Sequence, residues 1–315
     1  MKKISLLISP EIKSAYFAQY TECALAELQF CFPGLEARLN SIGLLDFIDI
    51  EVDQETLEEI SYMSFFHGAF EQIDGTLKPL DLKAQFSLHD NFIFGSKFKG
   101  KTNERFTQLM INLGKASINN KENIKVLDPM CGRATTLLWC LRYGIISKGI
   151  ELDPRAIMDV TQIVKKWSKI CSIRTTIKDG FVGKKNKLGL GKFIEVSHEK
   201  NHFKMISGNS ANCSELLSSE RFDLIITDIP YGIQHRTDNG LNNPFDAIDI
   251  SLAQWKKCLK KDGSIVIGYN SNNPKRDVVI ELAQKHSMLA LEFNIAHRMS
   301  ESIVRDVIIL KHAQQ

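Results

Sequence analysis

From Ile124 onward, short apolar runs that read as strands alternate with helical segments. Alternation of this kind is typical of a parallel sheet whose strands are joined by crossover helices. The last two strands are neighbours in the sequence, which predicts that they close the sheet as an antiparallel hairpin at its edge. We therefore expect an α/β, Rossmann-like fold with a seven-stranded, mostly parallel sheet. The expected strands are residues 125–128, 145–152, 203–207, 222–227, 264–269, 289–295 and 303–310.

The first 100 residues read as a separate, small α+β unit. A chain of 315 residues is longer than one compact core usually holds, so two domains, 1–100 and 101–315, are expected. The stretch from Gly95 to Lys101 is glycine-rich and basic, which predicts either a solvated linker or a strip that touches phosphates or closes over a cofactor. In the small unit we expect strands at 4–8 and 47–52 and helices at 11–32 and 54–64.

Composition excludes several classes of protein. The hydrophobic content of 43% and charged content of 24% are ordinary for a globular chain, and no apolar run approaches the length of a membrane span. The apolar part of residues 1–10 is too short for a signal peptide. The seven cysteines are scattered, without a C-x-x-C pair, which argues for reduced thiols and against a metal site or a disulfide framework. These features predict a cytoplasmic protein with no metal.

The net charge is only +3, so any surface that meets a nucleic acid must be local. The long connection between the second and third expected strands is one candidate. Residues 172–204 hold eight Lys or Arg against three acids, and their glycines suggest a β-hairpin. The segment is either a solvated surface loop or a basic flap that meets a polyanion.

One strand end carries an unusual set of groups. Residues 224–227 form a buried strand that stops at Asp228, and Ile229-Pro230-Tyr231-Gly232 then makes a stiff turn. A carboxylate, a free carbonyl and an aromatic ring are thus held at the C-terminal end of a strand, where open α/β sheets bind ligands. The stretch predicts a pocket for a flat, amine-bearing base. The next side chains, which could hold phosphates or a base edge, are Gln234, His235 and Arg236.

Three further clusters fall at the ends of the first three expected strands. The turn from Asp128 to Thr136 lacks the G-x-G-x-x-G pattern of dinucleotide binders, and its carboxylate suits a ligand with an ammonium group and no phosphates. Glu151, 23 positions later, stands where doubly wound folds bind ribose hydroxyls, although Asp153 is an alternative that could instead cap a helix. Asn209 could pair with an adenine edge or simply form a turn.

Taken together, these clusters resemble the class I S-adenosylmethionine-dependent methyltransferases that act on exocyclic amines of bases. Their Asp/Asn-Pro-Pro-Tyr/Phe motif is seen as Asp228-Ile-Pro-Tyr231. With Val126-Leu-Asp-Pro-Met-Cys-Gly132 and Thr136-Leu137, the chain looks most like the tRNA guanosine-N2 methyltransferases related to the eukaryotic Trm-eleven subunit. The resemblance covers about residues 90 to 310. Two departures are Ile229 in place of the first proline and Ala134 in place of a glycine.

The resemblance implies a class I methyltransferase fold, S-adenosylmethionine as cofactor and RNA, foremost tRNA, as partner, and leaves open a protein activator subunit. It also implies that the small N-terminal unit is the ferredoxin-like neighbour of an RNA-binding domain. The implied catalytic residues are Asp228, Ile229, Pro230 and Tyr231. The implied cofactor residues are Thr102, Asp128, Pro129, Met130, Cys131, Gly132, Thr135, Glu151, Leu152, Asn209, Ser210 and Asp228. The implied substrate residues are Lys99, Lys101, Gln234, His235 and Arg236.

Several alternatives stay open. The same pocket motif serves adenine-N6 methylation, and rRNA is an alternative to tRNA as the substrate of guanine-N2 methylation. A catalytically silent cofactor-binding partner subunit is a non-enzyme alternative, although Asp228 and Tyr231 are intact. A nicotinamide dehydrogenase is disfavoured because the glycine fingerprint is missing.

Overall fold

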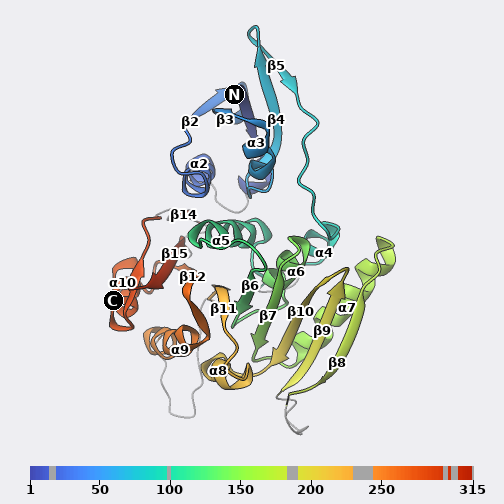
Figure 1. Cartoon of the computed structure of the whole chain (residues 1–315), viewed down its shortest axis with the longest axis vertical. Helices are drawn as coiled ribbons and strands as arrows, with labels where there is room; N and C mark the ends of the chain where they lie inside the picture. The colour runs from blue at the N-terminus through green and yellow to red at the C-terminus, as the bar shows by residue number, and fades with distance from the viewer. Residues whose placement is uncertain are drawn as a thin grey trace.

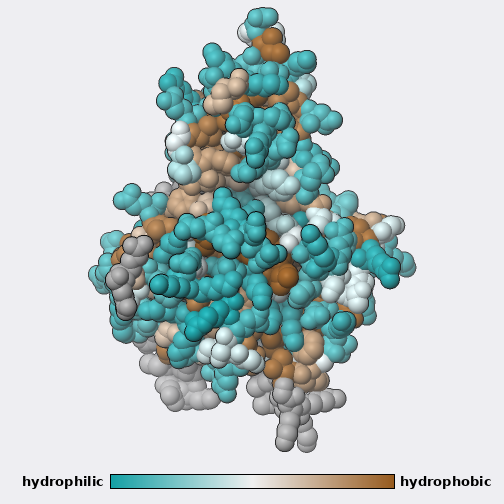
Figure 2. Space-filling view, viewed as in Figure 1, coloured by the Kyte–Doolittle hydropathy of each residue, from teal (hydrophilic) through white to brown (hydrophobic). Residues whose placement is uncertain are grey.

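The structure is a computed structural model that describes residues 1–13, 19–97, 101–182, 191–229, 244–293, 297–298 and 304–313. It contains a five-stranded sheet and a ten-stranded sheet. Figure 1 shows the smaller sheet at the top, above helix α5 (Glu104–Ser117), and the larger sheet with its helices below. No helix within the described ranges is long and apolar enough to cross a membrane. Figure 2 shows that hydrophilic side chains cover most of one face, with small hydrophobic patches over the N-terminal unit.

The N-terminal unit is an antiparallel sheet with two helices, in the order β-α-β-β-α-β and then a fifth strand. Its strands lie in the order β2-β3-β1-β4-β5, and the β-α-β-β-α-β succession is that of the ferredoxin-like fold. The apolar side of β1 buries Ile4, Leu6 and Ile8. The elements are β1 (Lys2–Ile8), the 3-10 turn η1 (Pro10–Ile12), α2 (Tyr20–Cys31), β2 (Ala37–Ile42), β3 (Leu45–Val52), α3 (Gln54–Ile60), β4 (Phe66–Ile73) and β5 (Thr76–Pro79).

Several sequence predictions for this unit need correction. Where one helix was expected at residues 11–32, the structure has the turn η1 at Pro10–Ile12 and the helix α2 from Tyr20 to Cys31. The second helix ends at Ile60 and not at residue 64, because the chain turns there to start β4 at Phe66. Strands β2, β4 and β5 were not predicted. Strand β2 is an edge strand whose residues are almost all exposed, so it lacks the apolar alternation that marks a half-buried strand.

The large sheet confirms the predicted α/β, mostly parallel fold. Its order is β13-β15-β12-β11-β6-β7-β10-β9-β8, and β12, β11, β6, β7 and β10 run parallel. The strands are β6 (Lys125–Asp128), β7 (Ile146–Glu151), β8 (Thr176–Phe181), β9 (Lys192–His198), β10 (Asn201–Ser207), β11 (Phe222–Asp228), β12 (Leu259–Asn270), β13 (Met288–Ala290), β14 (His297–Arg298) and β15 (Val304–His312). The helices besides α5 are α4 (Asn91–Phe94), α6 (Thr135–Arg142), α7 (Arg155–Ile170), the 3-10 turn η3 (Ser210–Asn212), α8 (Cys213–Leu216), α9 (Pro244–Cys258) and α10 (Arg276–Lys285).

The predicted antiparallel pair at one edge of this sheet is confirmed, because β15 pairs antiparallel with the edge strand β13 and lies between it and β12. The hairpin predicted in the basic segment between β7 and β10 is also confirmed, as β8–β9. The hairpin pairs with β10 and widens the sheet, which has ten strands and not the predicted seven. The hairpin is therefore part of the sheet and not a free surface loop.

Two hydrophobic cores explain why the central strands read as continuous apolar runs. Leu224 and Ile226 of β11 pack into the core that includes α5, α6 and α7, whereas Ile225 packs into the core that includes α8, α9 and α10. A parallel strand covered on both faces needs apolar residues at every position, unlike a strand with one face in water.

The N-terminal unit is joined to α5 by a buried polar network. The carboxylate of Glu27 in α2 accepts hydrogen bonds from the backbone N–H of Ser64 (3.0 Å) and from Nδ2 of Asn112 in α5 (2.7 Å). The hydroxyl of Tyr143, which follows α6, lies 2.8 Å from Oδ1 of Asn112. The core around Ile4 also continues into residues of β6 and β11. The small unit therefore packs directly on the helices that flank the large sheet.

Candidate active site

Two buried carboxylates end two neighbouring parallel strands. Asp128 is the last residue of β6 and Asp228 the last residue of β11, at the point where successive connections leave the sheet in opposite directions. Ligands of open α/β sheets bind at such a switch point, beyond the carboxyl ends of the strands. The predicted catalytic aspartate and the predicted cofactor aspartate therefore lie side by side.

Asp128 is only 3% exposed. Burial raises its pKa to about 7, and the negative charge of Asp228 raises the pKa further, while hydrogen bonds from Thr136, the Met130 N–H and Thr227 oppose the shift. The Met130 N–H donates to Oδ1 at 3.1 Å. A carboxylate that is costly to ionise in the folded protein gains from a cation placed beside it. The site thus favours a positively charged ligand.

Asp228 is paired with Arg305 of β15. Nη2 of Arg305 lies 3.3 Å from Oδ2 of Asp228, and the two side chains are 7% and 9% exposed. Burial raises the pKa of Asp228, whereas Arg305 and Thr102 lower it. Oδ1 is also buried, and it forms no hydrogen bond with any residue that the structure describes. Oδ2 is therefore held by Arg305, and Oδ1 is a buried acceptor without a donor among the described residues.

Gly268 of β12 makes room for this arrangement. It stands opposite Asp228 in the ladder, and its carbonyl accepts the Ile229 N–H at 2.8 Å. A Cβ at Gly268 would lie 2.6 Å from Cε1 of Phe106 and 3.1 Å from Oδ1 of Asp228. Both distances are too short for a side chain, so only glycine lets α5 and the carboxylate approach the strand together.

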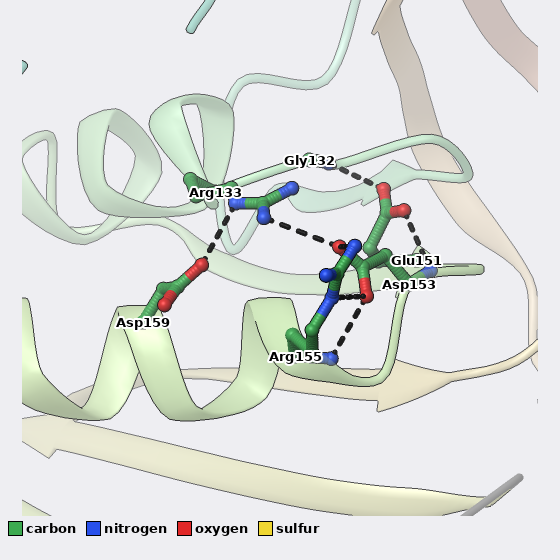
Figure 3. A network of polar contacts seen from close by, with 6 residues as sticks. All are labelled: Gly132, Arg133, Glu151, Asp153, Arg155 and Asp159. Carbon is green, nitrogen blue, oxygen red and sulfur yellow. Dashed lines mark hydrogen bonds and ion pairs between the residues drawn. The ribbon is translucent and has the colours of Figure 1, made fainter. Parts of the chain in front are cut away.

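Glu151 forms hydrogen bonds with three turns at the edge of the sheet where the cofactor is predicted to bind. Its carboxylate accepts the Gly132 N–H through Oε2 and the Asp153 N–H through Oε1, both at 2.9 Å (Figure 3). Its backbone carbonyl accepts the Gly208 N–H at 2.9 Å. A carboxylate oxygen can accept more than one hydrogen bond, so each oxygen of Glu151 can also accept a hydrogen bond from a ribose hydroxyl.

A second layer of ion pairs supports the first turn. Arg133 lies between α7 and the end of β7, with Nε 3.1 Å from Oδ2 of Asp159 and Nη2 3.2 Å from Oδ2 of Asp153 (Figure 3). Asp153 also accepts the Arg155 N–H at 3.0 Å, so it caps the start of α7. Burial opposes ionisation of Asp153, but the hydrogen bonds from Arg155 lower its pKa. Asp153 is thus held by the protein, which leaves Glu151 as the ribose candidate.

The first turn is tightly built around small residues. A Cβ at Gly149 of β7 would lie 2.7 Å from Sγ of Cys131 and 2.7 Å from Cδ1 of Leu137. Gly132 has φ +52°, and Ala134 has φ +65° and is buried. Ala134 replaces the glycine of related motifs yet adopts the left-handed conformation that glycine prefers. The turn geometry is therefore preserved despite the substitution.

The remaining cofactor candidates line the same edge. Leu152 directly follows Glu151 and is 55% exposed, as a surface for a flat ring would require. Asn209 is exposed, but its Oδ1 accepts the Ala211 N–H at 2.9 Å and caps a short 3-10 turn that begins at Ser210. The oxygen of Asn209 thus serves a turn, which was the alternative interpretation.

Lys101 has a different role from the predicted substrate contact. Its ammonium group donates to the carbonyls of Ile93 and Ser96 and to the carboxylate of Glu104, and its side chain is 11% exposed. Three acceptors of the chain itself leave this group poorly placed to bind a phosphate. It anchors the segment that brings Thr102 to Asp228. The predicted residues that lie outside the described ranges are Lys99, Pro230, Tyr231, Gln234, His235 and Arg236.

Sequence reasoning missed three residues that build the site, namely Arg133, Gly268 and Arg305. Arg305 left a signal, because it is a charged residue within the apolar run Ile303 to Leu310 of a predicted core strand. Buried charges in such strands are rare unless they are paired. The sequence could not name the partner.

Comparisons with known proteins agree with the resemblance in the motifs. No family model matches the chain. The tRNA (guanine(10)-N(2))-methyltransferase TRMT11 of Homo sapiens is 23% identical over 171 residues, which cover 54% of this chain and 33% of the relative. The TRMT11 of Pongo abelii matches to the same extent. The chain thus spans about a third of the length of the curated relatives it matches.

Solved structures are similar at lower identity. TrmN from Thermus thermophilus superposes with a TM-score of 0.45 at 13% identity, covering 89% of this chain and 60% of that one. An rRNA methylase from Streptococcus thermophilus gives a TM-score of 0.37 at 11% identity, covering 63% of this chain and 90% of that one.

Proposed function

We propose that this protein is an S-adenosylmethionine-dependent methyltransferase that modifies an exocyclic amine of a nucleobase in RNA, foremost N2 of guanosine in tRNA. The observation that carries the proposal is the Asp228 carboxylate at the end of β11, which Arg305 holds through Oδ2 and whose Oδ1 lacks a donor among the described residues, beside a turn suited to a cationic cofactor. The similarity to a tRNA guanine-N2 methyltransferase supports the same acceptor.

The residues of the edge fit the cofactor group by group. Asp128 is a buried carboxylate with a raised pKa, and a nearby cation would stabilise its ionised form. This suits the ammonium and sulfonium groups of S-adenosylmethionine. Glu151 offers acceptors for ribose hydroxyls, and exposed Leu152 offers an apolar surface for adenine. Bound S-adenosylmethionine supplies an electrophilic methyl group on a sulfonium. The protein therefore needs to align the acceptor more than to provide acid catalysis.

Asp228 is the residue that we expect to bind the acceptor amine. An exocyclic amine is a weak nucleophile because its lone pair is delocalised into the ring. The Asp228 carboxylate would accept one amine N–H, and the carbonyl of Ile229 would accept the other, which favours a pyramidal nitrogen and stabilises the developing positive charge. Tyr231 would stack on a base that has been unpaired or flipped out, as the motif resemblance implies.

The same constellation would serve adenine N6 or the N2 of an rRNA guanine, because both present an amine on a flat ring. A silent cofactor-binding subunit is the non-enzyme alternative. The retention of Asp228, with a buried carboxylate oxygen that lacks a donor among the described residues, favours catalysis over that alternative.

The test is methyl transfer from labelled S-adenosylmethionine to total tRNA, rRNA and DNA, read by nucleoside mass spectrometry. We expect N2-methylguanosine in tRNA from the wild type and a loss of about 100-fold or more in Asp228→Asn, the usual scale for removing one transition-state contact. The matched control is Asp223→Asn at the opposite end of β11, where the carboxylate holds the Lys125 N–H and Lys260. This control should keep activity. N6-methyladenine would change the substrate, and transfer to no acceptor despite cofactor binding would refute catalysis by the chain alone.

A further inference from the structure

Arg305 reaches the amine site from a strand that lies two positions away in the sheet. Strand β15 pairs with β12, which pairs with β11, and Arg305 stands opposite Asn270 near the carboxyl end of β12. Its guanidinium crosses above β12, where Gly268 has no side chain, and ends 3.3 Å from Oδ2 of Asp228. The carbon of the guanidinium also lies 4.8 Å from the centre of the Phe106 ring. Packing on a ring and a bond to a carboxylate fix the plane of this group.

We propose that Arg305 is a positioning residue of the amine site, which fixes the Asp228 carboxylate through Oδ2 and keeps it ionised as an acceptor for the substrate amine. The inference rests on the proposed function and deepens it. It assigns to a residue of β15 the task of holding the carboxylate that meets the acceptor amine.

The groups that face Asp228 make Arg305 important for its ionisation. Burial raises the pKa of Asp228, whereas Arg305 and the hydroxyl of Thr102 lower it, and Gly268 on β12 contributes no side chain. Asp128 on β6, whose own pKa is raised to about 7, is largely neutral at pH 6. Among the residues that the structure describes, Arg305 is the cation that lowers the pKa of Asp228. Without it, burial would favour the protonated acid. A protonated carboxyl carries a proton on one oxygen and can no longer accept an amine N–H there.

The arrangement also selects the kind of acceptor. A carboxylate held in its anionic form accepts hydrogen bonds only, so an N–H of an exocyclic amine is satisfied there. A ring carbonyl or an unprotonated ring nitrogen placed at the same point would face a negative charge without a donor. Such a mismatch is a strong basis for discrimination, because it leaves buried polar groups unpaired.

Strand β15 offers a matched control for a merely structural role. Nη1 of Arg276 lies 2.7 Å from Oδ2 of Asp306, which is fully buried, so this second ion pair is also built on β15. Asp306 follows Arg305 directly and therefore points to the opposite face of the sheet. Removing Arg276 should disturb the strand without touching Asp228.

The experiment compares wild type with Arg305→Met, Arg305→Lys and Arg276→Met. The first readout is the pH dependence of kcat/KM for methyl transfer to the tRNA. We expect Arg305→Met to move the acidic limb of the profile upward by about one pH unit or more, so that its defect is about tenfold or larger at pH 6 and shrinks as the pH rises. Arg305→Lys should restore the limb in part, and Arg276→Met should leave it in place. Thermal unfolding and cofactor binding check that each variant is folded.

The second readout does not depend on activity. Carboxyl-carbon NMR of protein labelled at aspartate, with the Asp228 signal assigned by Asp228→Asn, reports the titration of this group directly. We expect its midpoint to rise in Arg305→Met and to stay unchanged in Arg276→Met. A defect in Arg305→Met that is equal at every pH, with an unshifted Asp228 titration, would overturn the inference. Absence of transfer by the wild type would refute the proposed function instead, while the titration would still report whether Arg305 controls Asp228.

Discussion

The raised pKa of Asp128 makes a stability prediction that can be tested without any RNA. The change is Asp128→Asn, which removes a buried charge but keeps the shape of the side chain. In the wild type the Met130 N–H donates to Oδ1 of the Asp128 carboxylate, and the amide oxygen of the variant can still accept this hydrogen bond. The main effect should therefore be electrostatic and not a loss of packing.

The magnitude follows from the size of the shift. Burial raises the pKa of Asp128 from 3.8 to about 7, a difference of about three units. At about 1.4 kcal/mol for each unit, ionising this group in the folded protein costs about 4 kcal/mol. Because the folded pKa lies above the unfolded one, the stabilising contribution of the neutral acid is complete below pH 4 and is lost as the pH rises through 7. The cofactor-free wild type should therefore become less stable over this range.

The assay is urea unfolding of the cofactor-free protein at pH 5, 6.5 and 8. We expect the wild type to lose free energy of unfolding with rising pH, and Asp128→Asn to lose about 2.5 kcal/mol less between pH 5 and pH 8, because the rest of the effect falls below pH 5. At pH 8 the variant should be the more stable protein, yet it should bind S-adenosylmethionine more weakly by calorimetry. Higher stability together with weaker cofactor binding would show that Asp128 serves ligand binding and not the stability of the fold.

A control with the opposite sign is available in the same edge. Hydrogen bonds from Arg155 lower the pKa of Asp153, although burial opposes them, so its contribution is present at neutral pH and is lost as the pH falls through the folded pKa. Asp153→Asn should therefore reduce stability at pH 8 and have less effect in acid. Equal pH slopes in wild type and Asp128→Asn would refute the reasoning, because they would show that Asp128 ionises in the folded protein without a penalty.

Two further predictions concern packing. Gly149→Ala should lower the free energy of unfolding by about 1–3 kcal/mol and weaken cofactor binding, because a Cβ there would lie 2.7 Å from Sγ of Cys131 in the first turn; unchanged values in urea unfolding and calorimetry would contradict this. Asn112→Ala should lower the free energy of unfolding by about 3 kcal/mol, since Asn112 bonds to Glu27, Tyr62 and Tyr143 between the two sheets. Asn112→Ala should also make the chain between the two units sensitive to limited proteolysis. The control Asn209→Ala, at an exposed position, should not have this effect. Equal resistance of the two variants would argue against a fixed N-terminal unit.

The sequence alone determined the class of the large sheet and the positions of its main chemical groups. Short apolar runs that end in Asp128, Glu151 and Asp228 could be read as parallel strands, and parallel strands place their carboxyl ends on one edge. Local chemistry also suits a helix start at Thr102 or Asn103, and it is Asn103 that caps α5 by accepting the Phe106 N–H. Signals of this kind lie within a few residues of the structure they specify, so a single chain reveals them.

Only the tertiary structure decided which distant residues meet. Arg305 and Asp228 are 77 positions apart, and they touch because β15 lies between β12 and the edge strand β13. Strand order depends on the packing of both sheet faces and on pairings across long loops, for which no local pattern exists. The exposed edge strand β2 could not be predicted for a related reason, because a strand with no buried face shows no alternation of apolar and polar residues in the sequence. The carboxylates could thus be found from sequence, but the cation that orients one of them could not.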